Sequence, residues 1–153
     1  MRRAMFLLAL SGVWGQSLEI TPSSVDRGSA NIFRILLKYS SGKEPAALQW
    51  EILAPPEIMI ELAGIVVGSE AEGAAKALTC AGKKGAEAGR AYACILAGGV
   101  KPIPEGAIAI VRYSAGPKAE AGQLKVRIEK AAGASVELKR LSIADASGMI
   151  TIR

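Results

Sequence analysis

Two cysteines, Cys80 and Cys94, are the residues whose type and spacing most directly indicate a chemical bond. Two thiols are too few for a structural metal site, and the chain has no histidine to complete one. Their separation also differs from the Cys-x-x-Cys spacing of redox-active pairs. In an exported chain such a pair is expected to form a structural disulfide, which would close a short loop.

The lack of histidine also removes whole classes of catalysis. No Ser–His or Cys–His pair and no imidazole general base can form. The carboxylates are scattered, and the only aspartates, Asp26 and Asp145, lie outside any calcium-binding pattern. The sequence has no Gly-x-Ser-x-Gly motif and no glycine-rich phosphate loop. We therefore expect no enzyme activity, no metal and no cofactor.

Exposed aromatic rings would indicate carbohydrate binding, because a ring can stack on the apolar face of a sugar. Phe33, Tyr39 and Trp50 fall on faces that are predicted to point inward, where core packing is expected. Tyr92 and Tyr113 remain as candidate exposed rings, and they are the predicted carbohydrate-binding residues. Two rings make a small platform, which weighs against crystalline cellulose or chitin.

Alternation of apolar and polar residues indicates the elements that would position these side chains. Leu124, Val126 and Ile128 alternate with charged neighbours, and residues 31–39 and 47–53 follow the same period of two. This period predicts half-buried antiparallel strands. Turn residues divide about nine or ten such segments, so we predict an all-β fold, an antiparallel jelly-roll β-sandwich.

The outward positions of these strands are candidates for a protein-binding face. Most of them are charged, so an ordinary solvated surface is the alternative interpretation. An exposed apolar patch on one sheet would distinguish a docking face from solvated surface. The candidate contacts are Arg34, Lys38, Gln49, Glu51, Lys125 and Arg127.

Two segments depart from the strand pattern. Residues 69–76 have a helix-forming composition, with Ser69 as a possible N-cap, and predict a single turn or an irregular loop. Residues 81–90, between the cysteines, are rich in Gly, Lys and Ala. They predict a mobile hairpin tip whose base the disulfide would staple.

The beginning of the chain has the organisation of a secretory signal peptide. Arg2 and Arg3 precede a short apolar run over residues 4–10, and small residues follow it. We predict a signal peptide over residues 1–16, one domain over residues 17–153 and a secreted or periplasmic location. The apolar run is too short to span a bilayer, so no membrane span is expected after cleavage.

The net charge gives little indication of a partner. The chain carries a formal charge of +5, but no run of Lys and Arg could follow a phosphate backbone. A mild basic excess of this kind serves solubility, and no nucleic-acid partner is expected.

Four segments, taken in order, give the chain a resemblance to the superfamily of cohesin-like and carbohydrate-binding-module β-sandwiches. That resemblance implies a nine-stranded jelly roll in an exported bacterial protein. It also implies a binding function, since cohesins bind dockerin modules through one sheet face and sister modules bind polysaccharides. The segments that carry it are residues 18–22 (LEITP), 45–52 (PAALQWEI), 106–113 (GAIAIVRY) and 143–152 (IADASGMITI).

Three functions therefore stay open. The first is a non-catalytic module that binds a dockerin-like protein on a sheet face. The second is a carbohydrate-binding module, which requires exposed Tyr92 or Tyr113. The third is a structural or assembly component of the cell envelope, which predicts unpaired edge strands and self-association. The sequence leaves the oligomeric state undetermined.

Overall fold

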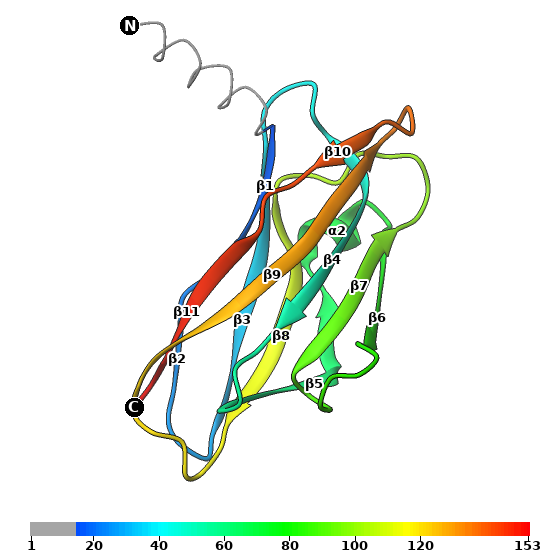
Figure 1. Ribbon diagram of the computed structural model, residues 1–153. Coiled ribbons are helices and arrows are strands. Elements are labelled where there is room, and N and C mark those ends of the chain that lie inside the picture. The colour runs from blue at the N-terminus through cyan, green and yellow to red at the C-terminus, as the bar shows by residue number, and fades with distance from the viewer. Residues whose placement is uncertain (1–14) are drawn as a thin grey trace, which may run out of the picture.

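The computed structural model describes residues 15–153, which form two β-sheets packed face to face (Figure 1). Most of the predicted signal peptide therefore lies outside the described residues. Gln16 is the first residue of the first strand and is buried. Among residues 15–153, no helix has the length and the apolar character needed to cross a membrane.

The smaller sheet has four strands, and the larger has seven. The order in the smaller sheet is β1 (Gln16–Ile20), β3 (Ala30–Tyr39), β8 (Gly106–Ala115) and β5 (Ile58–Val67). The order in the larger sheet is β2 (Ser23–Val25), β11 (Ala146–Ile152), β9 (Gly122–Ser135), β4 (Pro45–Leu53), β7 (Ala91–Ala97) and β6 (Ala77–Gly82), and β10 (Arg140–Ser142) pairs with β9.

The predicted all-β sandwich is confirmed, with two additions. The three-residue strands β2 and β10 are too short for alternation to reveal them. In addition, β2 pairs in parallel with β11, whereas every other strand pair is antiparallel.

The core forms where the inner faces of the two sheets meet. Phe33 and Trp50, both predicted to point inward, are fully buried there. The rings of Phe33 and Tyr113 lie 5.8 Å apart between centroids in a tilted arrangement, which is a favourable geometry for aromatic pairs. The alternation in β3 and β4 thus places every second side chain in the core and leaves the others on the outer faces.

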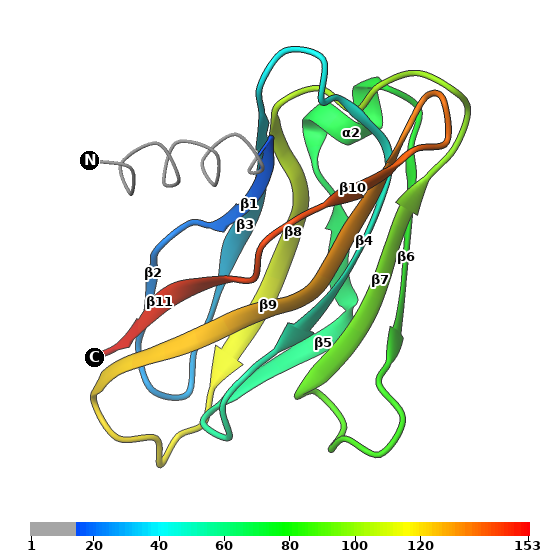
Figure 2. The same cartoon turned by 45° about the horizontal axis from the view of Figure 1, so that its top comes forward.

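The chain between β5 and β6 covers one end of the sandwich with a single helical turn, α2 (Ser69–Gly73) (Figure 2). The predicted turn is confirmed, but Ser69 is not its N-cap: Gly68 takes that position, without a side-chain cap. Lys76 follows the turn and is 5% exposed, and its ammonium donates to the Gly98 carbonyl at 2.7 Å. Burial lowers the pKa of Lys76.

The predicted disulfide is present between Cys80 of β6 and Cys94 of β7. These residues are direct cross-strand partners, with their Cα atoms 4.1 Å apart. The bond therefore fastens the edge strand β6 to the sheet near the base of the hairpin, as the sequence predicts. The tip of the hairpin is residues 83–90 and not the predicted 81–90, because β6 continues to Gly82.

Replacing both cysteines in the Cys80→Ser/Cys94→Ser variant is expected to lower the free energy of unfolding by about 3 kcal/mol, because the loop between them is no longer closed in the unfolded chain. Denaturant titration of the oxidised protein and of the variant measures this difference. Reducing agent should destabilise the parent and leave the variant unchanged. Equal free energies of unfolding for the oxidised parent and the variant would contradict a stabilising role for the disulfide.

Candidate functional site

The two tyrosines that were candidates for sugar stacking lie in the core. Tyr92 is 6% exposed, and its hydroxyl donates to the Ile60 carbonyl at 2.9 Å. Tyr113 is 1% exposed, and its hydroxyl donates to Ser23 Oγ at 2.6 Å. The prediction that these rings are exposed is wrong, because each shares its strand parity with inward aliphatic residues such as Leu96 and Val111.

Neither tyrosine can therefore offer a ring face to a sugar. Both use the hydroxyl to connect the two sheets, Tyr92 from β7 to β5 and Tyr113 from β8 to β2. Phe33 and Trp50 are also buried, and Tyr39 is half-buried. Residues 15–153 thus present no fully exposed aromatic ring for carbohydrate stacking.

The candidate protein-binding residues do not share one face. Arg34 and Lys38 lie on the outer face of the four-stranded sheet, where Lys38 pairs with Glu19 at 3.2 Å. The other candidates lie on the outer face of the seven-stranded sheet, on β4 and β9, and are Gln49, Glu51, Lys125 and Arg127. Sequence alternation correctly indicates an outward direction, but it cannot assign strands to sheets.

A row of uncharged side chains crosses the outer face of the seven-stranded sheet. Gln49 pairs with Ile95 on one side and with Ala132 on the other, and Ile95 pairs in turn with Thr79. Ile95 is 55% exposed, although it is a large aliphatic residue on an inner strand of the sheet, β7. The four strands β6, β7, β4 and β9 thus share an outer surface, which we call the docking face because it is the candidate surface for protein binding.

The docking face is hollowed next to Ile95. The hollow has a volume of about 280 Å³, and Leu138, which is 86% exposed, stands at its border. The turn after β9 holds Leu138 outward, since its N–H donates to the Ser135 carbonyl and its φ is 65°. The lining residues are Ala47, Leu48, Gln49, Ile95, Ala132, Gly133, Ala134, Leu138 and Arg140.

A bulge in β9 creates this hollow. Lys130 has a φ of 54°, and the register between β4 and β9 shifts there. Before the bulge, odd-numbered residues such as Arg127 point outward; after it, Ala132 and Ala134 point outward. The docking face therefore changes from long charged side chains to alanines within one strand.

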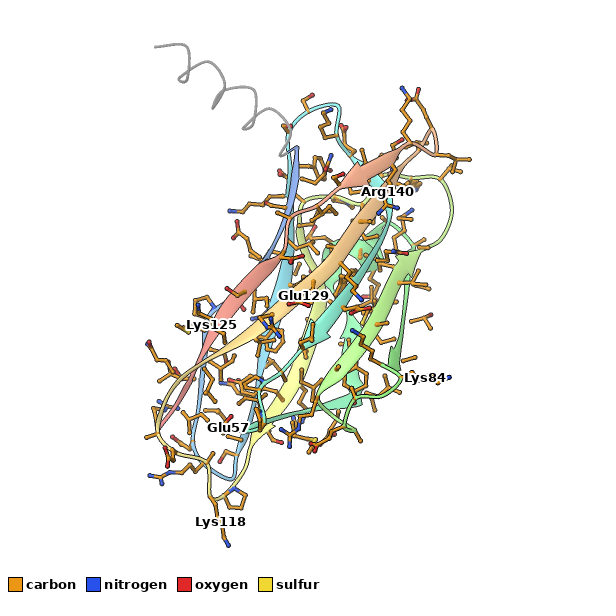
Figure 3. The ribbon with its side chains drawn as sticks, in the orientation of Figure 1. Glu57, Lys84, Lys118, Lys125, Glu129 and Arg140 are labelled. Carbon is orange, nitrogen blue, oxygen red and sulfur yellow. A yellow bond between two sulfur atoms is a disulfide. The ribbon has the colours of Figure 1, made fainter. Side chains whose placement is uncertain are left out.

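The other half of the docking face is charged. Glu51 lies between Lys83, at 2.8 Å, and Lys130, at 3.9 Å. Arg127 pairs with Glu129 at 2.7 Å, and Glu129 is the cross-strand partner of Glu51. The hydrogen bond with Glu51 raises the pKa of Lys83. Figure 3 shows Lys125, Glu129 and Arg140 following one another along β9 and β10.

Alternation alone missed the residues that make the docking face distinctive. Ile95 and Leu138 carry no charge or aromatic ring, and the alanines of β9 follow the segment whose alternation is regular. The available signal was the change at residues 130–132, where the charged alternation ends in Lys-Ala-Ala. A break of this kind inside a strand is typical of a bulge.

The comparisons with known proteins identify the fold. No family model and no curated protein matches this chain. Solved cohesin structures do match it, with low sequence identity. Each of the three matches given next covers 90% of this chain. They include a non-cellulosomal cohesin from Archaeoglobus fulgidus (TM-score 0.72, 10% identity, 91% of that chain), a type I cohesin–dockerin complex from Clostridium thermocellum (TM-score 0.74, 12% identity, 99% of that chain), and a ScaC cohesin in complex with the ScaB dockerin from Acetivibrio cellulolyticus (TM-score 0.73, 15% identity, 98% of that chain).

These matches establish the class of protein by shape: the chain has the cohesin-like β-sandwich fold, as the sequence resemblance implied. At such low sequence identity they establish the fold alone. What the outer faces bind depends on the residues of this chain's own surface.

Replacing Tyr113 with Phe is expected to cost about 1 kcal/mol of unfolding free energy, because the hydroxyl between the two sheets is lost. Burial raises the pKa of Tyr113 above its ordinary value of 10.0. The folded protein therefore keeps the proton at a pH where the unfolded chain releases it, so this contribution is lost as pH rises above 10.

Urea titrations of both proteins between neutral pH and the alkaline range test this prediction. The difference between parent and Tyr113→Phe should shrink as pH rises through the raised pKa. The effect of Lys76 is common to both proteins and cancels in the difference. A difference that is zero at neutral pH, or that grows with pH, would contradict the assignment.

Proposed function

We propose that this protein is a non-catalytic protein-binding module whose partner, a dockerin-like module, docks on the outer face of β6, β7, β4 and β9. The observation that carries the proposal is the exposed Ile95 beside an apolar hollow, in the middle of a sheet face. Exposed apolar patches rimmed by polar groups are typical of protein–protein interfaces.

The composition of the docking face fits a protein partner. Ile95 and Leu138 can bury apolar surface in a contact, while the alanines around the hollow let a partner side chain approach the sheet closely. The charged half, around Glu51 and Arg127, can fix the orientation of the partner and accelerate association. Cohesins of the same fold have been crystallised with dockerins, which supports a partner of that kind.

The carbohydrate-binding alternative lacks a comparable observation. Its candidate rings, Tyr92 and Tyr113, are occupied with inter-sheet hydrogen bonds in the core. The hollow on the docking face has no exposed aromatic residue in its lining, so it offers no stacking platform for a sugar.

We also propose that the protein is exported. The support is the arrangement of residues 1–16, with two arginines before a short apolar run, together with the disulfide of the folded domain. N-terminal sequencing of the protein from the source cells is expected to find a mature N-terminus near Gln16 in the exported fraction. An intact N-terminus in cytoplasmic protein would contradict export.

Replacing Ile95 with Lys is expected to weaken dockerin binding by about 30-fold or more, because it places a charge in the apolar centre of the contact. The measurement is isothermal titration calorimetry of the parent and the variant against a panel of recombinant dockerin modules. Ile95 is exposed, so the substitution should leave the thermal midpoint nearly unchanged.

The matched control is Val66→Lys. Val66 is an exposed aliphatic residue of similar character, on the outer face of the four-stranded sheet. It should leave dockerin affinity unchanged. Equal losses of dockerin affinity in the two variants, or a loss only in Val66→Lys, would contradict binding at the docking face. If no dockerin in the panel binds the parent, the proposal of a dockerin-like partner is wrong.

A further inference from the structure

The strand β6 forms an open edge of the seven-stranded sheet. It pairs with β7 on one side and has no hydrogen-bonded strand on the other. Figures 1 and 2 both show β6 at the margin of the sheet, beside β7. The disulfide between Cys80 and Cys94 holds this margin to the sheet.

The register determines which backbone groups face the open side. Lys83 donates its N–H to the Ala91 carbonyl, so the odd-numbered residues of β6 exchange hydrogen bonds with β7. The N–H and C=O groups of Leu78, Cys80 and Gly82 must then point away from β7. The hydrogen bonds of the described residues give none of these groups a partner.

Edge strands of soluble proteins are usually protected by charge, proline or a bulge. The strand β6, with the sequence ALTCAG, contains none of these, and charge stands only beyond its ends, at Lys76 before it and at Lys83 and Lys84 after it. Its outward side chains belong to Ala77, Thr79 and Ala81, which are too small to hinder an approaching strand. A strand of this composition is therefore a template for a further strand.

We propose that β6 pairs antiparallel with β6 of a second copy of this protein, about a two-fold axis at Cys80. The two seven-stranded sheets would then form one continuous sheet across the dimer. Leu78, Cys80 and Gly82 of one copy would face Gly82, Cys80 and Leu78 of the partner copy. Each pair would exchange both of its hydrogen bonds.

The side chains of β6 are complementary in this register. The half-buried Leu78 faces Gly82 of the partner copy, which has no side chain and has open space where a Cβ would stand. On the outer face, Thr79 lies opposite Ala81 of the partner copy. No charged residue lies within residues 77–82, and the like charges closest to the contact are Lys76 and Lys84 of the partner copy, which face each other just beyond its ends. A self-complementary strand of this kind favours a second copy over an unrelated peptide as the occupant.

The two-fold axis of such a pair is perpendicular to the sheet, so both docking faces point to the same side of the dimer. The dimer would present two partner sites together, which increases avidity for a partner that carries two modules. The pairing itself rests on the edge of β6 alone and does not depend on the identity of the partner.

Sedimentation velocity of the oxidised protein over a concentration series tests the pairing. The parent is expected to dimerise with a dissociation constant below about 100 µM. Thr79→Lys is expected to weaken dimerisation by about tenfold or more, because two introduced lysines lie diagonally across the axis. The control Gln123→Lys adds the same charge on β9, far from this edge, and should dimerise like the parent.

A second substitution tests the register. Because residue 79 faces residue 81 of the partner copy, the double variant Thr79→Lys/Ala81→Glu places opposite charges across the contact and should restore dimerisation. A parent that stays monomeric at about 100 µM overturns the proposal. A Thr79→Lys variant that dimerises as strongly as the parent also overturns it. The same holds if the double variant stays monomeric although its thermal midpoint equals that of the parent, since it is then folded.

Discussion

The structure depends on the burial of two sheet faces against each other. Trp50 and Phe33 fill the space between the sheets, and Tyr92 and Tyr113 connect the sheets through their hydroxyls. This chain has few aromatic residues, and the core takes Phe33, Trp50, Tyr92 and Tyr113. This demand explains why the outer faces formed by residues 15–153 lack fully exposed rings, and why recognition on these faces would use aliphatic, small and charged side chains.

Local features then shape the docking face from the same scaffold. The bulge at Lys130 reverses the parity of β9, which divides the face into a charged half around Glu51 and an alanine-lined hollow beside Ile95. The disulfide fixes β6 at the margin of this face. The resulting surface combines apolar area with charges that can orient a partner, and it is offered by β-strands whose positions the core determines.

The sequence predicted the features that follow from periodicity and composition. Alternation identified the inward positions of Phe33 and Trp50, and the cysteine pair predicted the disulfide. Alternation failed for Tyr92. Its polar hydroxyl and its small neighbours hid the fact that it points inward, on the same side of the strand as Leu96. Alternation also could not assign Arg34 and Gln49 to opposite sheets, because strand order follows from long-range pairing that no local pattern records. The hollow depends on such pairing and on the register shifts between β4 and β9.

The most direct test of the docking face is methyl NMR of the protein during titration with dockerin modules, with alanine and isoleucine methyl groups labelled. The face supplies its own probes in Ala47, Ile95, Ala132 and Ala134, and the opposite sheet supplies Ile32 and Ile110 as internal controls. We expect the shifts of the first group to change and saturate while those of the controls stay constant. Changes confined to Ile32 and Ile110, or no change with any dockerin, would contradict binding at the docking face.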